Sequence, residues 1–274
     1  MTSLAIAAPA LGRSIVAELV ERQRLLAMFG FAALLLAIPT LAMIAADPRM
    51  LGGVSVWVKP AKFLVSVGIF ALSAAWFYGY TAQDRRRSWT LRLSAAAIAL
   101  GGGLELAYIA WQASQGLESH FNTGTAFHAA MYGLMGVAAV TMVVALLPIA
   151  WAVIRHPAPG VRPDFAAAVA IGIFLTLLLG GGLGGYMSSS PGHSVGAQGG
   201  QFPLFGWNRA GGDLRVAHFF GMHAEQAIPL LAWLAAGWTA RARWAVLIGG
   251  SALYVAVTLA VFFQAVAGRP FLAF

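Results

Sequence analysis

The sequence predicts an all-α membrane protein, a polytopic bundle of seven transmembrane helices with a cytoplasmic N-terminus and an extracytoplasmic C-terminus. Three observations support this fold class. Of the 274 residues, 60% are hydrophobic and only 9% are charged, whereas soluble domains carry about 25% charged residues. Seven apolar stretches reach the length of about 20 residues that a spanning helix needs. Charged residues, proline and glycine are concentrated in the connectors between these stretches.

The first element is a short amphipathic segment. In residues 12–24, apolar and charged side chains alternate at roughly helical spacing, which predicts an interfacial helix within a cytoplasmic N-terminal segment, residues 1–24. A solvated lead-in to the first span is the alternative. Residues 25–274 follow as a single transmembrane domain with a long outer loop, residues 188–216. Its spans are expected at residues 25–46, 62–80, 93–113, 127–153, 165–187, 217–238 and 244–267.

Lysine and arginine residues predict the orientation, because cytoplasmic loops of membrane proteins carry an excess of them. With the N-terminus inside, 11 of the 17 Lys and Arg residues lie in cytoplasmic segments. This bias accounts for most of the net charge of +8, so the charge does not indicate a nucleic-acid partner. The expected partner is the lipid bilayer of a cytoplasmic (inner) membrane, and the high content of Ala, Gly and Arg is typical of a bacterial source.

Glycine runs occur in two of the expected spans, at residues 101–103 and within residues 180–185. Close approach of neighbouring helices is the first interpretation of such runs. The alternatives are a helix that unwinds near a binding site and a flat cofactor that lies against bare backbone.

Polar side chains inside the expected spans are functional candidates, because an ionisable group in a bilayer costs about 2.5–3.5 kcal/mol. Glu105 and Glu225 are both expected about eight residues, or roughly 12 Å, from the outer ends of their helices. This shared depth predicts a polar pocket in the outer-leaflet half of the membrane. Its expected members, besides histidines, are Lys59, Lys62, Glu105, Tyr108, Gln112, Tyr132, Arg215, Met222, Glu225 and Gln226.

Three histidines, His128, His218 and His223, lie within or at the edge of spans at similar depth. His218 and His223 are five residues apart, so in a regular helix their directions differ by about 140°. They cannot ligate one metal ion together unless the helix is distorted. A hydrogen-bonded packing role is the alternative for each of them.

Several functions remain open on this evidence. The leading hypothesis is a b-type haem with His128 and His223, or His218, as ligands, in an electron-transfer protein or membrane oxidoreductase that uses a quinone or a small apolar substrate. In that case Lys62 or Arg215 is a candidate partner for a haem propionate. A zinc, copper or iron ion held by His128, His218, His223 and Glu225 is the second cofactor hypothesis, and a metal-dependent membrane hydrolase would follow from it.

Two hypotheses need no cofactor. A proton-coupled transporter or carrier would use Glu105 and Glu225 as its protonation sites, and an accessory subunit would pair its polar faces with a partner protein. The chain contains no cysteine, so thiolate ligands and thiol nucleophiles are excluded. Asp213 is expected to cap the helix of the sixth span, or else to form a charged rim with Arg209 and Arg215.

Overall fold

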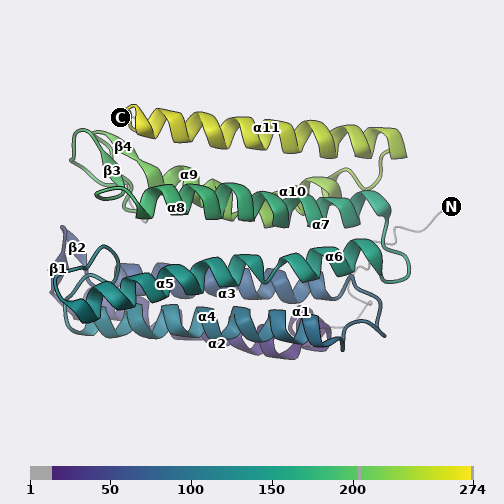
Figure 1. Cartoon of the computed structure of the whole chain (residues 1–274), viewed down its shortest axis with the longest axis horizontal. Helices are drawn as coiled ribbons and strands as arrows, with labels where there is room; N and C mark the ends of the chain where they lie inside the picture. Colours follow the sequence, from purple (N-terminus) through teal and green to yellow (C-terminus); the bar gives the residue numbers. More distant parts are fainter. Residues whose placement is uncertain (1–13, 203–204, 273–274) are drawn as a thin grey trace. The chain divides into compact units, whose positions relative to one another are not determined.

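The structure, a computed structural model, describes residues 14–202 and 205–272. The chain divides into two compact units, which we treat separately. The N-terminal unit has its described residues at 14–159, and the C-terminal unit has them at 160–202 and 205–272. Both units are built from long helices, with short strand pairs in their loops (Figure 1). The expectations for residues 1–13 lie outside the described residues, and the single transmembrane domain stays a prediction.

The N-terminal unit begins with a short helix in the segment expected to be interfacial. Ser14 caps this helix by accepting a hydrogen bond from the Ala17 N–H. A two-stranded hairpin then connects the second and third helices. The elements of this unit are α1 (Ile15–Arg22), α2 (Arg24–Ala46), β1 (Met50–Leu51), β2 (Val54–Ser55), α3 (Val58–Tyr78), α4 (Trp89–Ser114), α5 (Ala126–Val144) and α6 (Leu147–Arg155).

The C-terminal unit contains two interrupted helical rods and one continuous helix. The first rod changes from α-helix to π-helix and back, and the second rod is broken at His223. The elements are α7 (Pro163–Leu175), the π-helix η1 (Thr176–Gly181), α8 (Gly182–Ser188), β3 (Ser194–Val195), β4 (Gly212–Asp213), α9 (Leu214–Met222), α10 (Ala224–Leu234) and α11 (Ala240–Val266).

Six helical segments in the described part of the chain are long and apolar enough to cross a membrane. They fall within a few residues of six of the seven expected spans, so the all-helical membrane class is confirmed. The remaining stretch, residues 217–238, folds as α9 and α10, and neither is long enough alone. The count of seven spans is therefore not confirmed. The orientation also stays a prediction.

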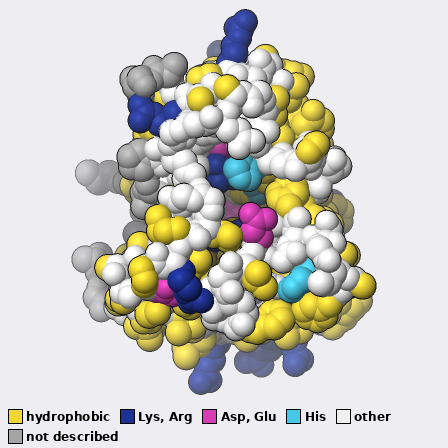
Figure 2. All heavy atoms as spheres, turned by 90° about the vertical axis from the view of Figure 1, so that its left-hand side faces the viewer, with side chains coloured by type: hydrophobic (Ala, Val, Ile, Leu, Met, Phe, Trp, Pro, Cys, Tyr) yellow, Lys and Arg dark blue, Asp and Glu magenta, His cyan; other side chains and the backbone are white. Residues whose placement is uncertain are grey.

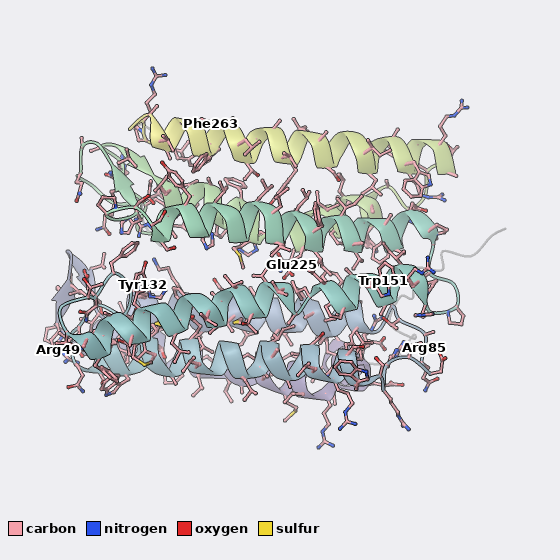
Figure 3. The ribbon with its side chains drawn as sticks, in the orientation of Figure 1. Arg49, Arg85, Tyr132, Trp151, Glu225 and Phe263 are labelled. Atoms are coloured by element: carbon pink, nitrogen blue, oxygen red, sulfur yellow. The ribbon has the colours of Figure 1, made fainter. Side chains whose placement is uncertain are left out.

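The outer surfaces of the helices are apolar, as expected for contact with lipid. Leu35, Ile248 and Phe263 each expose more than 60% of their surface, and Figure 2 shows hydrophobic side chains along the flanks of one face. Tryptophan favours membrane–water interfaces, and the guanidinium carbon of Arg155 lies 5.4 Å from the ring centre of the exposed Trp151. In the N-terminal unit, Trp151 and Arg85 lie at the same end of the helices (Figure 3).

Small residues allow the helices of each unit to pack closely. A Cβ atom added to Gly30 of α2 would lie 2.9 Å from the Gly68 carbonyl oxygen of α3. A Cβ atom added to Gly101 of α4 would lie 2.8 Å from Met142 of α5. The packing interpretation of the first glycine run is therefore confirmed at Gly101. In the second run, the π-helix shows that packing and local distortion occur together.

A glycine pair in the C-terminal unit gives a testable prediction. A Cβ atom added to Gly221 of α9 would lie 2.5 Å from the Gly180 nitrogen and 2.7 Å from the Leu179 carbonyl carbon, both backbone atoms of η1. We expect Gly221→Ala to lower the free energy of unfolding by about 1–3 kcal/mol, as overpacking does. Gly182→Ala is the matched control, because a Cβ atom there meets nothing within 4 Å. Equal melting temperatures of the two variants in detergent would contradict this packing.

Candidate functional site

The first polar group lies in the N-terminal unit, where α4 packs against the start of α5. Thr125 caps α5 by accepting a hydrogen bond from the His128 backbone N–H at 3.2 Å. This cap places His128 in the first turn of the helix. Tyr108 and Gln112 are one turn apart on α4 and share a face. We call these three residues, Tyr108, Gln112 and His128, the His128 cluster.

Three hydrogen bonds close the His128 cluster into a triangle. Gln112 Nε2 lies 2.6 Å from Tyr108 Oη and 3.0 Å from His128 Nδ1. Tyr108 Oη lies 3.2 Å from the same His128 nitrogen. Gln112 is fully buried, and its Oε1 has no hydrogen-bond partner. The structure therefore brings together three of the residues that the sequence assigned to one polar pocket.

Other expected pocket members of this unit make different contacts. Glu105 is buried on α4, and the positive charge of Lys59 lies close enough to act on it. The ring of Tyr132 contacts that of His120 at a centroid distance of 6.1 Å. Lys62 lies in the second turn of α3. His120, in the loop between α4 and α5, also packs against Phe63.

The second polar group lies in the C-terminal unit, where the two helix interruptions meet. The Thr176 hydroxyl, at the start of η1, accepts a hydrogen bond from the Glu225 backbone N–H at 2.9 Å and lies 3.5 Å from the Met222 carbonyl oxygen. It thus satisfies backbone groups that the break at His223 frees from helical bonding. Figure 3 shows Glu225 about half-way along the helices of this unit. Glu225 lies further along its helical rod than expected, because α9 begins at Leu214, three residues before the predicted span.

A chain of hydrogen bonds leads from His223 to Glu225. Gln226 Nε2 donates to Glu225 Oε1 at 2.6 Å, and Gln226 Oε1 lies 3.2 Å from His223 Nδ1. Because the amide nitrogen donates to the carboxyl group, the amide oxygen must accept, so His223 Nδ1 carries a proton. Glu225 has no exposed surface, and its Oε2 has no hydrogen-bond partner. We call His223, Gln226 and Glu225 the Glu225 chain.

His218 lies on α9 against the glycines of the neighbouring rod. Its Nδ1 lies 2.9 Å from the Gly180 carbonyl oxygen, which can only accept, so this nitrogen also carries a proton. A Cβ atom added to Gly184 would lie 2.8 Å from the His218 ring, so the ring occupies space that a larger residue would fill. Met222, one turn further along α9, lies against Gly180.

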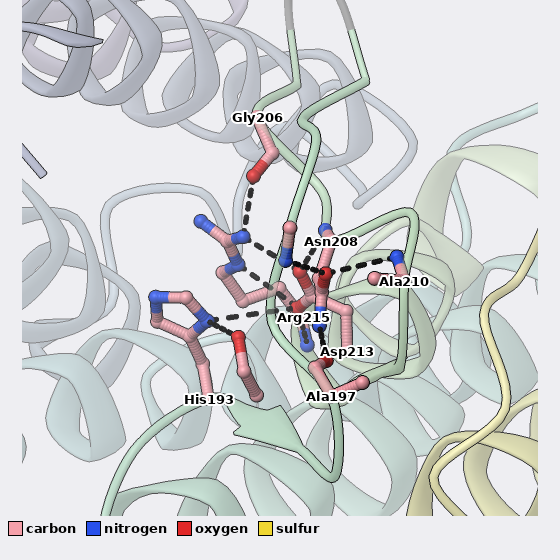
Figure 4. Close-up of polar contacts among 9 residues, drawn as sticks. His193, Ala197, Gly206, Asn208, Ala210, Asp213 and Arg215 are labelled. Carbon is pink, nitrogen blue, oxygen red and sulfur yellow. Dashed lines mark hydrogen bonds and ion pairs between the residues drawn. The ribbon is translucent and has the colours of Figure 1, made fainter. Parts of the chain in front are cut away.

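Arg215 is not part of the Glu225 chain. It belongs to a separate group, Asn208, Asp213 and Arg215, which we call the loop anchor. Asp213 is almost fully buried and accepts hydrogen bonds from Arg215 Nε at 2.9 Å and Arg215 Nη2 at 2.6 Å (Figure 4). It also accepts from the backbone N–H groups of Arg215 and Asn208. His193 Nδ1 lies 4.0 Å away. The expected helix cap at Asp213 is confirmed, and the same carboxylate fastens the preceding loop to the start of α9.

The loop anchor has a defined pH dependence. Burial acts to raise the pKa of Asp213, but the hydrogen bonds and charge of Arg215 outweigh it, so the pKa is lowered. A lowered pKa stabilises the folded form above the ordinary Asp value of about 3.9, and this stabilisation is lost as the pH falls through the folded-state value. We therefore expect trypsin cleavage after Arg209, measured relative to cleavage of an unstructured control peptide at the same pH, to be equally slow at pH 7 and at pH 5.

Removing the Asp213 charge by mutation should weaken the loop anchor at neutral pH, as protonation of Asp213 does in acid. We expect Asp213→Asn to speed trypsin cleavage after Arg209 severalfold at pH 7, because Arg215 loses its ionic partner. Asp84→Asn, which changes an exposed aspartate in another loop, is the control. Unchanged cleavage in Asp213→Asn would show that the anchor does not hold the loop.

The structure bears on the metal-ion hypothesis through the positions of its candidate ligands. Among the described residues, no three or more His, Asp and Glu side chains lie together as a metal site would require. The helix is distorted at His223, which removes the sequence argument against a joint role for His218 and His223. His128 is in the N-terminal unit and His218 and His223 are in the C-terminal unit, so the predicted ligand pair of His128 and His223 stays a prediction.

Two contributors to the second group were not foreseen from sequence. Thr176 looks like an ordinary small polar residue in an apolar span, and the Gly180 carbonyl carries no sequence signal at all. The glycine run that follows Thr176 was the available signal, because an unwound helix was one of its interpretations.

Comparisons with known proteins do not assign this chain to a family. No protein-family model matches the sequence, and searches among curated proteins and among solved structures found no match. The fold and its six candidate spans define the broad class of an integral membrane protein with an all-helical architecture. Its function has to be inferred from the residues of the chain itself.

Proposed function

We propose that this integral membrane protein is a proton-coupled carrier, located in a bacterial inner membrane, in which Glu225 takes up and releases the proton. The observation that carries the proposal is the state of the Glu225 carboxyl group. It is fully buried, receives one hydrogen bond at Oε1 and has no partner at Oε2. A charge in such surroundings is costly, so the protonated form is favoured until the surroundings change.

The helix interruptions support coupling between this proton and a conformational change. Discontinuous helices that meet near the middle of the membrane are typical of secondary transporters, where the irregular backbone forms the binding site. Here η1 and the break at His223 meet through Thr176. A movement of η1 relative to the break at His223 would alter the contacts of Glu225 directly, because the Glu225 backbone N–H donates to the Thr176 hydroxyl.

The Glu225 chain supports a route for the proton. His223 is partly exposed, whereas Glu225 is buried. With a proton fixed on Nδ1, the His223 ring presents Nε2 as an acceptor for a proton from the surroundings. In this proposal His223 exchanges protons with the surroundings. Gln226 fixes the positions of the His223 and Glu225 side chains through its two hydrogen bonds. Glu105, the buried acid of the N-terminal unit, is the second candidate protonation site.

Proton entry into vesicles tests the proposal. The purified protein would be reconstituted into liposomes that contain a pH-sensitive dye, and a potassium diffusion potential, negative inside, would drive protons inward. The assay would be run with and without an external mixture of amino acids, sugars and short carboxylates. We expect faster acidification than in empty liposomes in at least one condition. Equal rates in every condition would contradict the proposal.

A b-type haem remains the second candidate, and one observation favours it. Metal-ligating histidines usually donate the proton of the other ring nitrogen to a carbonyl or carboxylate group. The contact of His218 Nδ1 with the Gly180 carbonyl fits this pattern. It leaves Nε2 of His218 as the candidate ligand of the haem iron. Optical spectra of the protein before and after dithionite would test it. A Soret band that shifts on reduction and is lost in His218→Ala would favour haem, and a spectrum of aromatic absorbance alone would oppose it.

A further inference from the structure

The His128 cluster determines which nitrogen of His128 faces outward with a proton. Gln112 Nε2 carries two hydrogens, one for Tyr108 Oη and one for His128 Nδ1. The Tyr108 hydroxyl, having accepted one of them, is left to donate toward the same His128 nitrogen. His128 Nδ1 is therefore the acceptor at the end of the network. In a neutral ring, the proton must then be on Nε2.

The outward nitrogen of His128 is accessible. His128 is partly exposed, and Nε2 is absent from the buried unpartnered atoms of the described residues. The cluster thus presents one N–H donor of fixed direction at the end of a buried network. Such a donor binds an acceptor oxygen, whereas a metal ion would need the lone pair that this tautomer does not offer on Nε2.

Aromatic rings lie beside this donor. The Phe127 ring contacts the His128 ring at a centroid distance of 5.5 Å and the Trp111 ring at 5.9 Å. Trp111 in turn contacts Tyr108 at 5.8 Å. Trp111 and Phe127 expose 47% and 54% of their surfaces. Exposed rings beside a single polar group suit a flat, apolar ligand with one accepting oxygen, because rings stack favourably and the polar group fixes orientation.

A purely structural role does not account for Gln112. Its Oε1 is buried without a partner, and such an atom costs about 1–3 kcal/mol. A leucine would fill the space without that cost. What glutamine adds is the donor that makes His128 Nδ1 an acceptor.

From these observations we infer that the N-terminal unit holds a binding site for a membrane-soluble quinone-type ring, whose carbonyl oxygen accepts a hydrogen bond from His128 Nε2 and whose ring lies against Phe127 and Trp111. This inference does not rest on the proposed function, because it involves none of the residues of the Glu225 chain. Binding of a quinone and movement of a proton through Glu225 can fail independently.

Nitrogen NMR of the histidines tests the inference on the unaltered protein. The chain has six histidines, so labelling histidine alone with ¹⁵N in nanodiscs gives few signals, and His128→Phe assigns the one of interest. We expect His128 to be protonated at Nε2 and this signal to shift saturably as ubiquinone-1 is added. A proton on Nδ1 instead, or no shift with ubiquinone-1, would overturn the inference.

Binding to variants gives the second measurement. We expect His128→Phe, which keeps a ring but removes the donor, to weaken ubiquinone-1 binding about tenfold, as loss of a hydrogen bond in an apolar site does. His156→Phe, in an exposed loop of the same unit, is the control and should bind as the unaltered protein does. Equal affinity of both variants would also overturn the inference.

Discussion

Glu225→Gln is expected to reduce voltage-driven proton entry into proteoliposomes to the rate of empty liposomes. Glutamine has nearly the same shape as glutamic acid, and its amide oxygen can still accept the hydrogen bond from Gln226 Nε2 that Glu225 Oε1 accepts. The variant should therefore fold, but an amide cannot release a proton in this pH range. The loss would be complete rather than graded, because Glu225 is the group that carries the proton in this proposal.

The control for this experiment is Glu118→Gln, which changes an exposed acid in the loop between α4 and α5. It makes the same carboxyl-to-amide change as Glu225→Gln, but at an exposed position, and should leave proton entry unchanged. Proton entry that survives in Glu225→Gln would remove this residue from the mechanism. If Glu105→Gln then abolished it, the coupling acid would lie in the N-terminal unit.

Asp164→Ala is expected to cause the largest loss of stability. Asp164 is buried at the start of α7, where its carboxylate contacts Arg162 Nη2 at 3.0 Å and Arg243 Nε at 3.1 Å. Arg243 is on α11, so this carboxylate links two helices of the C-terminal unit. Its removal leaves two largely buried guanidinium groups without their anion. Breaking a buried ion pair in this way costs about 3–5 kcal/mol.

Thermal unfolding in detergent measures this loss. A change of that size should lower the melting temperature by roughly 10 °C in a protein of this length. Asp84→Ala is the matched control: it also removes an aspartate from an ion pair with arginine, but its side chain is 75% exposed. Pairs of that kind contribute about 0–1 kcal/mol, so the control should melt near the unaltered protein. Similar melting temperatures for both variants would contradict the buried character of the Asp164 link.

Most helix positions could be predicted from sequence because membrane spans depend on a simple property. A run of about 20 apolar residues is enough to identify a span, and six expected spans agree with the structure. The seventh, residues 217–238, is not confirmed as a span because its helix is interrupted. Gly221 lies just before the break at His223, and Pro229, within α10, lacks the N–H that a regular helix would use. Both residues are visible in the sequence, but a prediction that uses only the length of an apolar run does not take them into account.

The candidate site was predictable in part. Tyr108 and Gln112 share a helix face, so their meeting follows from spacing on α4. The contact with His128 depends on how α4 and α5 pack, and sequence indicated only a similar depth. The join between Thr176 and Glu225 could not be predicted, because it depends on a π-helix facing a helix break. The directions of the histidine protons likewise depend on contacts from neighbouring helices.

The most direct test of the central claim is the protonation state of Glu225 in the membrane, measured by infrared difference spectroscopy in nanodiscs. The account predicts a carboxylic-acid carbonyl band at pH 7 that is missing in Glu225→Gln, retained in Glu118→Gln and reversibly lost as the pH is raised. The difference between the unaltered protein and Glu225→Gln isolates this residue from Glu105. If the two spectra agree in that band at every pH, Glu225 does not exchange a proton and the proposed carrier mechanism is wrong.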